Sequence, residues 1–331
     1  MRALAAIGVL AGFLTIPAAA ASPAGRIVFV RQIGEQAELF SVRPDRSGLT
    51  RLTREPDYDH APVWSPDGRL IASFGAGGIV LRNADGSVVR RIEIPVEGSL
   101  DEIRWSPDGR SLSYLVEHCS YEDPRGYVIP PCGDLWVVDS DGRGNRRLLD
   151  REVDMLDGDL SYSWSPTGRS LVYEALTNGP SWLAVVDLRS GRQRRIPGAA
   201  GSADPAWSPR GRIAFVRRRG LFAVGGDGRG LRRLARGTSL SRPAWSPDGR
   251  WLAYLAGERA RVGNRWAVLV VRADGRVRRR LGVATEDRRL VWSPDSRYVL
   301  WENFAERLLV AQANGRGNAR FLTRGLDPDW R

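Results

Sequence analysis

A six-residue motif recurs along the chain and constrains the fold more than any other feature. It reads Trp-Ser-Pro, any residue, Gly or Ser, and Arg, and its six copies begin at Trp64, Trp105, Trp164, Trp207, Trp245 and Trp292. Successive Trp residues are 41, 59, 43, 38 and 47 residues apart. A repeat of roughly 40–45 residues is typical of one blade of a β-propeller.

Each repeat has the pattern of a four-stranded antiparallel sheet. The motif is followed by an alternating apolar segment such as Leu252–Leu255, then by a variable loop and a second strand such as Leu135–Asp139. A tight turn such as Asp141-Gly142 leads into an Arg-rich outer strand. Asn, Asp and Gly suit these turns because they tolerate positive φ angles.

The two ends of the chain supply a seventh repeat between them. Leu326–Trp330 resembles the lead-in to Trp207, and Ile27–Val30 resembles the strand that follows that motif. We therefore predict one all-β domain over residues 22–331, a seven-bladed propeller in which the C-terminal strand ending at Trp330 pairs with the N-terminal strands from Ile27. Such closure leaves no sheet edge exposed. Six blades are the alternative.

The N-terminus has the features of a secretory signal. Met1-Arg2 is followed by an apolar stretch from Leu4 to Ile16 and by small residues that predict cleavage after Ala21. The apolar stretch is shorter than the about 20 residues that cross a bilayer. We predict a signal peptide over residues 1–21, no transmembrane segment after its removal, and a periplasmic or extracellular protein; a retained anchor is the alternative.

An exported protein can form disulfides, and the chain has two cysteines, Cys119 and Cys132. An oxidising compartment favours a bond between them that pins the loop they enclose. Their spacing does not match the Cys-x-x-Cys pattern of redox sites. We therefore predict a structural disulfide.

The repeats resemble the WD40-like repeats of the TolB propeller family, whose members are periplasmic or secreted. The resemblance covers essentially all of residues 22–331 and implies the propeller fold. It leaves function open, because similar propellers occur in prolyl peptidases and some polysaccharide lyases. TolB itself has an α/β domain ahead of a six-bladed ring, and we expect no such domain here. The Gly-x-Ser-x-Gly motif of the peptidases is also missing.

The residues just before each Trp should begin the innermost strands and ring one mouth of the central channel. Seven carboxylates and three arginines are prominent among them: Asp59, His60, Asp101, Glu102, Asp159, Asp204, Ser241, Arg242, Asp287, Arg288, Arg289 and Asp327. As a set they predict an acidic mouth that attracts a basic peptide segment or a divalent metal. The alternative is that each Asp caps a turn. If a metal binds, Asp59 and His60 are the candidate ligands; no cofactor is required.

The remaining charge has a structural interpretation. The turn residues Asp67, Asp108, Asp248 and Asp295 are expected to accept hydrogen bonds from turn N–H groups. All 50 basic residues are arginines, the net charge is +12, and the arginine runs fall on the outer strands. Export and the scatter of these arginines disfavour nucleic-acid binding, whereas attraction to an anionic surface polymer is plausible.

These patterns favour an exported, monomeric, non-enzymatic scaffold. It would bind a protein or peptide partner in the cell envelope through its loop-rich face and acidic channel mouth, because variable loops on a rigid scaffold are the usual place for binding. No residue is assigned a catalytic role. The alternatives are a metal-dependent lyase or hydrolase acting on a cell-surface polymer, and a receptor for a small ligand or ion at the same mouth.

Overall fold

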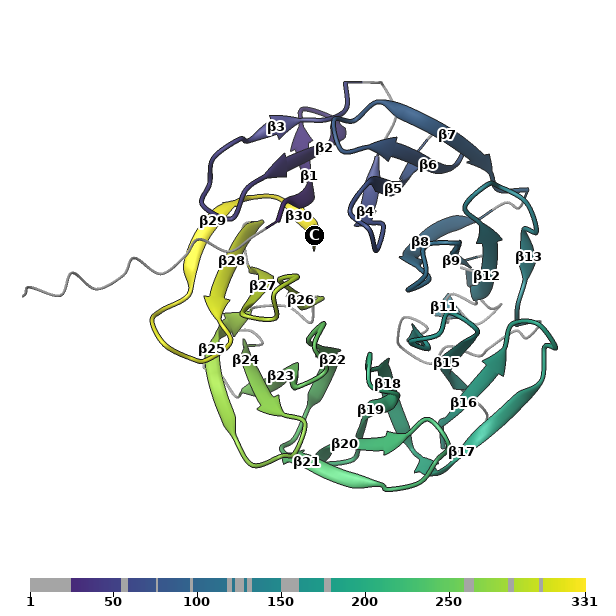
Figure 1. Ribbon diagram of the computed structural model, residues 1–331, viewed down its shortest axis with the longest axis vertical. Helices are drawn as coiled ribbons and strands as arrows, with labels where there is room; N and C mark the ends of the chain where they lie inside the picture. The colour runs from purple at the N-terminus through teal and green to yellow at the C-terminus, as the bar shows by residue number, and fades with distance from the viewer. Residues whose placement is uncertain are drawn as a thin grey trace, which may run out of the picture.

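Seven four-stranded antiparallel sheets stand around a central axis (Figure 1). The computed structural model describes residues 25–54, 59–75, 77–95, 98–117, 121–122, 128–129, 133–149, 161–175, 180–258, 265–284, 289–303 and 306–331. These residues form strands, and no helix long and apolar enough to cross a membrane is found among them. The predicted all-β, seven-bladed propeller is confirmed, and the six-bladed alternative is not.

Each blade runs from an innermost strand at the channel to an outer strand at the rim. The first four blades consist of β30 (Leu326–Trp330), β1 (Ile27–Ile33), β2 (Gln36–Val42) and β3 (Thr50–Arg51); β4 (His60–Trp64), β5 (Leu70–Gly75), β6 (Gly78–Asn83) and β7 (Val88–Glu93); β8 (Ser99–Trp105), β9 (Ser111–Glu117), β12 (Gly133–Asp139) and β13 (Arg146–Arg147); and β14 (Tyr162–Trp164), β15 (Ser170–Ala175), β16 (Trp182–Asp187) and β17 (Gln193–Ala200). The last three consist of β18 (Ser202–Trp207), β19 (Arg212–Arg217), β20 (Gly220–Gly225) and β21 (Arg232–Arg236); β22 (Leu240–Trp245), β23 (Trp251–Glu258), β24 (Arg265–Arg272) and β25 (Arg278–Ala284); and β26 (Val291–Trp292), β27 (Tyr298–Asn303), β28 (Arg307–Gln312) and β29 (Arg320–Arg324).

The ring is closed by the two ends of the chain, as predicted. β30 pairs with β1 so that Trp330 lies opposite Ile27, and Arg331 N–H donates to the Arg26 carbonyl at 2.9 Å. Gly25 adopts a φ of +98° beside Arg331, where an added Cβ would collide with the Arg331 carbonyl. Glycine is therefore needed at the point where the two ends meet.

The repeated motif builds the turn after each innermost strand. In blade 2, Ser65 Oγ donates to Asp67 Oδ1 at 2.6 Å and accepts from Leu70 N–H at 2.9 Å. The same Asp67 oxygen accepts from the N–H of Arg69 at 3.1 Å. Equivalent bonds to turn N–H groups are made by Asp108, Asp248 and Asp295, which confirms the structural role predicted for these residues.

The motif's Trp residues join neighbouring blades. The indole N–H groups of Trp105, Trp245 and Trp292 each donate to a carbonyl in the innermost strand of the preceding blade, at 3.3, 3.1 and 2.8 Å. Apolar clusters fill the space between sheets; one of them combines Ile27 and Phe29 of blade 1 with Leu300 and Leu308 of blade 7. Burying such a side chain contributes about 1.5–3 kcal/mol, so closure of the ring also completes its core.

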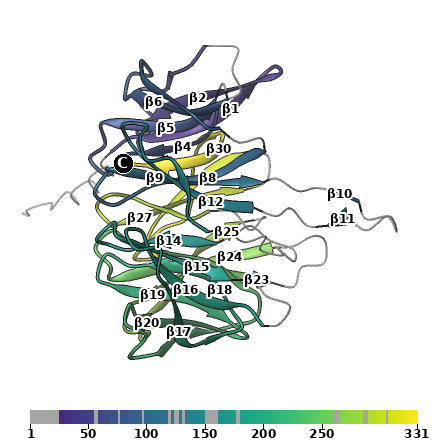
Figure 2. The same cartoon turned by 90° about the vertical axis from the view of Figure 1, so that its right-hand side faces the viewer.

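The two faces of the disc differ. The Trp-Ser-Pro turns and the C-terminus lie on one face, which we call the turn face. On the other face, the loop face, the connection between β9 and β12 carries a two-stranded hairpin of β10 (Tyr121–Glu122) and β11 (Val128–Ile129), which projects away from the disc (Figure 2).

Candidate functional site

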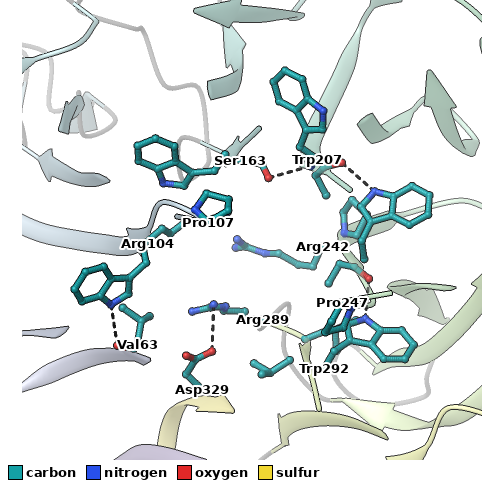
Figure 3. Close-up of a pocket in the computed structure, with 18 of the residues that line it drawn as sticks. Val63, Arg104, Pro107, Ser163, Trp207, Arg242, Pro247, Arg289, Trp292 and Asp329 are labelled. Atoms are coloured by element: carbon teal, nitrogen blue, oxygen red, sulfur yellow. Dashed lines mark hydrogen bonds and ion pairs between the residues drawn. The ribbon is translucent and has the colours of Figure 1, made fainter. Parts of the chain in front are cut away.

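The central channel contains two cavities that meet at a layer of arginines. The larger, of about 600 Å³, lies toward the turn face and is lined by all seven repeat Trp residues: Trp64, Trp105, Trp164, Trp207, Trp245, Trp292 and Trp330. The smaller, of about 310 Å³, lies toward the loop face. Arg104, Arg242 and Arg289 line both (Figure 3), so the channel is narrowed by charged side chains between its two ends.

A repeated β-bulge decides which side chains enter the channel. In five blades the innermost strand has one more residue than the strand paired with it over the same stretch. These bulges lie between His60 and Val63, Asp101 and Arg104, Ala203 and Ala206, Ser241 and Ala244, and Leu326 and Asp329. The residue three positions before each Trp then has a positive φ of 46–53°, at Ala61, Glu102, Asp204, Arg242 and Asp327. None of these is glycine, and such a conformation costs roughly 1–2 kcal/mol per residue. Bulges commonly re-aim side chains beside functional sites.

Arg104 is held firmly at the wall of the channel. Its Nη2 atom contacts both carboxylate oxygens of Glu102, at 3.0 and 2.9 Å, and its Nη1 donates to the Tyr162 carbonyl at 2.6 Å. The guanidinium also lies 4.7 Å from the centre of the Tyr162 ring. The Tyr162 hydroxyl in turn donates to the Glu102 carbonyl at 2.5 Å. Burial raises the pKa of this hydroxyl well above its ordinary value, so it remains a neutral donor.

Acidic residues bridge adjacent blades around the channel. Asp204 accepts from Ser161 Oγ at 3.0 Å in the preceding blade and from Arg242 N–H at 3.3 Å in the next. Asp329 accepts from Trp64 N–H at 2.8 Å and lies 3.5 Å from Arg289. These carboxylates therefore connect neighbouring innermost strands as well as lining the larger cavity.

A carboxylate pair lies next to this ring. The Asp204 N–H donates to Glu174 Oε2 at 3.4 Å, so that the end of β15 contacts the innermost strand of the following blade. Burial and the negative charge of Asp204 raise the pKa of Glu174 to about 7. Glu174 therefore changes charge near neutral pH.

The acidic residues predicted at the mouth fall into different places. Asp101 and Asp327 line the smaller cavity with His60, Asp204 lines the larger one, and Glu102 lines both. Asp59 is fully buried and faces Arg82, whose Nη2 lies 3.3 Å from its carboxylate. Burying a charge is costly unless it is paired, and this ion pair links the start of β4 to β6 inside the blade.

His60 is at the rim of the smaller cavity. Its Nε2 atom lies 3.2 Å from the Leu100 carbonyl of the next blade, and its ring packs at 5.2 Å from that of Phe74. Within the parts of the chain that the structure describes, no group of three or more His, Cys, Asp or Glu side chains could hold a metal ion.

Other predicted positions lie outside the described residues: the signal segment 1–21, Cys119, Cys132, Asp159, Asp287 and Arg288. The structure also adds lining residues that sequence reasoning did not single out. Arg104 and Asp329 stand one position before the Trp, and Glu302 is the second-to-last residue of β27 in blade 7.

Comparisons with known proteins agree with this architecture. No family model matches the chain. A TolB homolog of Chlorobium luteolum is 30% identical over 176 residues, which is 51% of this chain and 35% of the homolog. The crystal structure of TolB from Acinetobacter baumannii superposes with a TM-score of 0.57 at 14% identity, covering 92% of this chain and 82% of that one. The chain is a TolB-like β-propeller.

The propeller is also similar in fold to an enzyme. Oligogalacturonate lyase from Vibrio parahaemolyticus superposes on this TolB-like propeller with a TM-score of 0.60 at 16% identity, covering 91% of this chain and 86% of that one. At such identities the likeness concerns the fold alone. The matched region spans about a third of the Chlorobium homolog's length, so the function of this propeller must be argued from its own channel.

Proposed function

We propose that this TolB-like propeller is an exported, non-enzymatic scaffold that binds a protein or peptide partner in the cell envelope. Binding takes place on the loop face, at the smaller cavity. The similarity to TolB and the signal-like N-terminus support the location, and no chemical step is part of the proposal. Arginines on the outer strands would add attraction to anionic polymers at the cell surface.

One observation carries the proposal. Four carboxylates converge on the smaller cavity, those of Asp101, Glu102, Glu302 and Asp327, against three guanidinium groups. The bulge holds two of them, Glu102 and Asp327, in strained positive-φ conformations at the rim. A concave, acid-lined opening attracts a cationic side chain and can form charge-assisted hydrogen bonds with it. The expected ligand is therefore a basic segment of a partner.

A pair of isosteric substitutions tests this proposal. Asp101→Asn and Asp327→Asn together remove two charges while keeping size, and Asn tolerates the φ of +46° at position 327. We expect a fluorescein-labelled peptide of alternating Arg and Gly residues to bind the wild-type protein at 150 mM salt. The double variant should bind it about tenfold more weakly, which is 1.4 kcal/mol, as measured by fluorescence anisotropy.

The matched control removes the same charge elsewhere. Asp45→Asn and Asp274→Asn alter two turn residues of outer-strand connections, one exposed and one half-buried, far from the smaller cavity in the fold. This control should bind the peptide as the wild-type protein does. No binding to the wild-type protein, or an equal loss in the control, would refute the proposal.

A further inference from the structure

The larger cavity has a chemistry of its own. Three guanidinium groups enter it from three different blades: Arg104 from β8, Arg242 from β22 and Arg289, just before β26. Figure 3 shows Arg242 and Arg289 extending into the middle of the space, with Asp329 below Arg289. Arg331 lies at the same wall. This end of the channel therefore concentrates positive charge within a space of about 600 Å³.

The carboxylates that line the cavity already have structural partners. Glu102 is held by Arg104, Asp204 accepts hydrogen bonds from Ser161 and from the backbone of Arg242, and Asp329 accepts one from Trp64 N–H. Burial raises the pKa of Asp329, although Arg289 acts in the opposite direction. These acids position strands and arginines, but they do not fill the space between the guanidinium groups.

The arginines also act on one another. Burial lowers the pKa of Arg104 and the Glu102 carboxylate raises it, and the net result is a raised pKa. The positive charge of Arg242 acts in the opposite direction and lowers the pKa of Arg104. Because all three guanidinium groups line one cavity, their positive charges repel one another across it. Arg289 is about half exposed, at 54%, and its contact with Asp329 is a loose 3.5 Å. A bound anion would relieve this repulsion and give Arg289 a stronger partner.

We propose that the larger cavity binds a small polyanion that carries carboxylate or phosphate groups. Guanidinium groups present forked donors that match both kinds of oxyanion in a bidentate manner. The cavity volume is in the range of small-molecule sites, roughly 300–1,000 Å³. The wall of Trp and Pro side chains excludes bulk water from part of the site and so strengthens the ion contacts. This site opens toward the turn face, whereas the basic-peptide site opens on the loop face, and the two share the layer formed by Arg104, Arg242 and Arg289.

Isothermal titration calorimetry with citrate and with pyrophosphate at 150 mM NaCl tests the proposal. The wild-type protein should bind at least one of them at a single saturable site, and the preferred probe distinguishes a carboxylate from a phosphate ligand. Arg242→Asn combined with Arg289→Gln should weaken binding at least about tenfold. Asn is chosen at position 242 because the φ there is +50°.

Two comparisons separate a real site from the general attraction of a basic protein. Arg90→Gln combined with Arg192→Gln removes the same charge from exposed outer positions and should leave binding unchanged. If the channel variant loses its cooperative unfolding transition, Arg289→Lys replaces it as the test. This substitution keeps the positive charge but loses the forked donor geometry of the guanidinium group, so it should still weaken binding about threefold. No saturable binding of either probe, equal weakening by the outer variant, or unchanged binding in the channel variants would overturn the proposal.

Discussion

At the scale of single residues, the behaviour of a channel side chain depends on the blade next to it. Asp204 accepts hydrogen bonds from the blades on both sides, and its charge adds to burial in raising the pKa of Glu174 to about 7. Asp59, one of the acids before a repeat Trp, is instead enclosed with Arg82. The position of an acidic residue within the repeat therefore does not by itself determine whether its side chain lines the channel or is buried in an ion pair.

The raised pKa of Glu174 gives a pH-dependent stability. Between pH 4.5 and 7 the Glu174 carboxyl is deprotonated in the unfolded chain but still protonated in the folded protein. The free energy of unfolding therefore falls as the pH rises from 4.5 to 7, and above pH 7 this contribution no longer changes. Glu174→Gln removes the ionisable group and should raise the free energy of unfolding by about 1–3 kcal/mol at pH 8.5. The gain should shrink toward zero at pH 4.5, as measured by urea unfolding.

The exposed Glu93 on β7 serves as the control for this change, because Glu93→Gln should have little effect at either pH. A gain for Glu174→Gln that did not vary with pH would show that ionisation of this carboxylate is not the cause.

At the scale of elements, the bulged innermost strand is the unit that builds the channel. Its extra residue has a positive φ in five blades, although none of the five residues is glycine. The strain is maintained by the sheet on one side and by contacts with the neighbouring blade on the other, such as the hydrogen bond from Arg242 N–H to Asp204. The conformational free-energy cost of a positive φ is therefore repeated in five blades, each time at the place where side chains enter the channel.

Ala61→Gly measures this strain directly. Ala61 has a φ of +49° in the bulge of β4, so glycine should relieve the conformation and raise the free energy of unfolding by about 0.5–1 kcal/mol. Ala206 borders the bulge of β18 but has no positive φ, so Ala206→Gly should lower the free energy of unfolding by a similar amount because glycine only adds freedom to the unfolded chain. Urea unfolding of both variants checks this. Equal destabilisation by the two changes would contradict strain at the bulge.

The sequence predicted the strands and turns better than the directions in which their side chains point. The blades and the closing pair of β1 and β30 were predictable because each motif carries its own turn hydrogen bonds, as in Ser65 and Asp67. The position of Asp101, Glu102 and Asp327 beside the channel was predictable. Their orientation was not, because the bulge shifts the alternation by one residue, and because the partner of Asp59 is Arg82, 23 residues along the chain.

At the scale of the whole molecule, the closed ring turns seven similar strands into one channel with two different ends. Asp101, Glu302 and Asp327 lie toward the loop face, the Trp rings and Arg331 lie toward the turn face, and three arginines stand between the two ends. A rigid ring keeps both ends in fixed positions, which lowers the entropic cost of binding at either one. The propeller is thus suited to recognition, with the loop face as the proposed partner site.

The most direct test of this account locates a bound basic peptide on the molecule. The Arg-Gly peptide, carrying a photoreactive diazirine at one end, is bound at 150 mM salt and irradiated, and the attached residues are identified by mass spectrometry. The account predicts attachment at the loop-face ends of β4, β8 and β30, close to Asp101 and Asp327, and its loss in the Asp101→Asn, Asp327→Asn variant. Attachment mainly at the Trp-Ser-Pro turns or along the outer strands would contradict it.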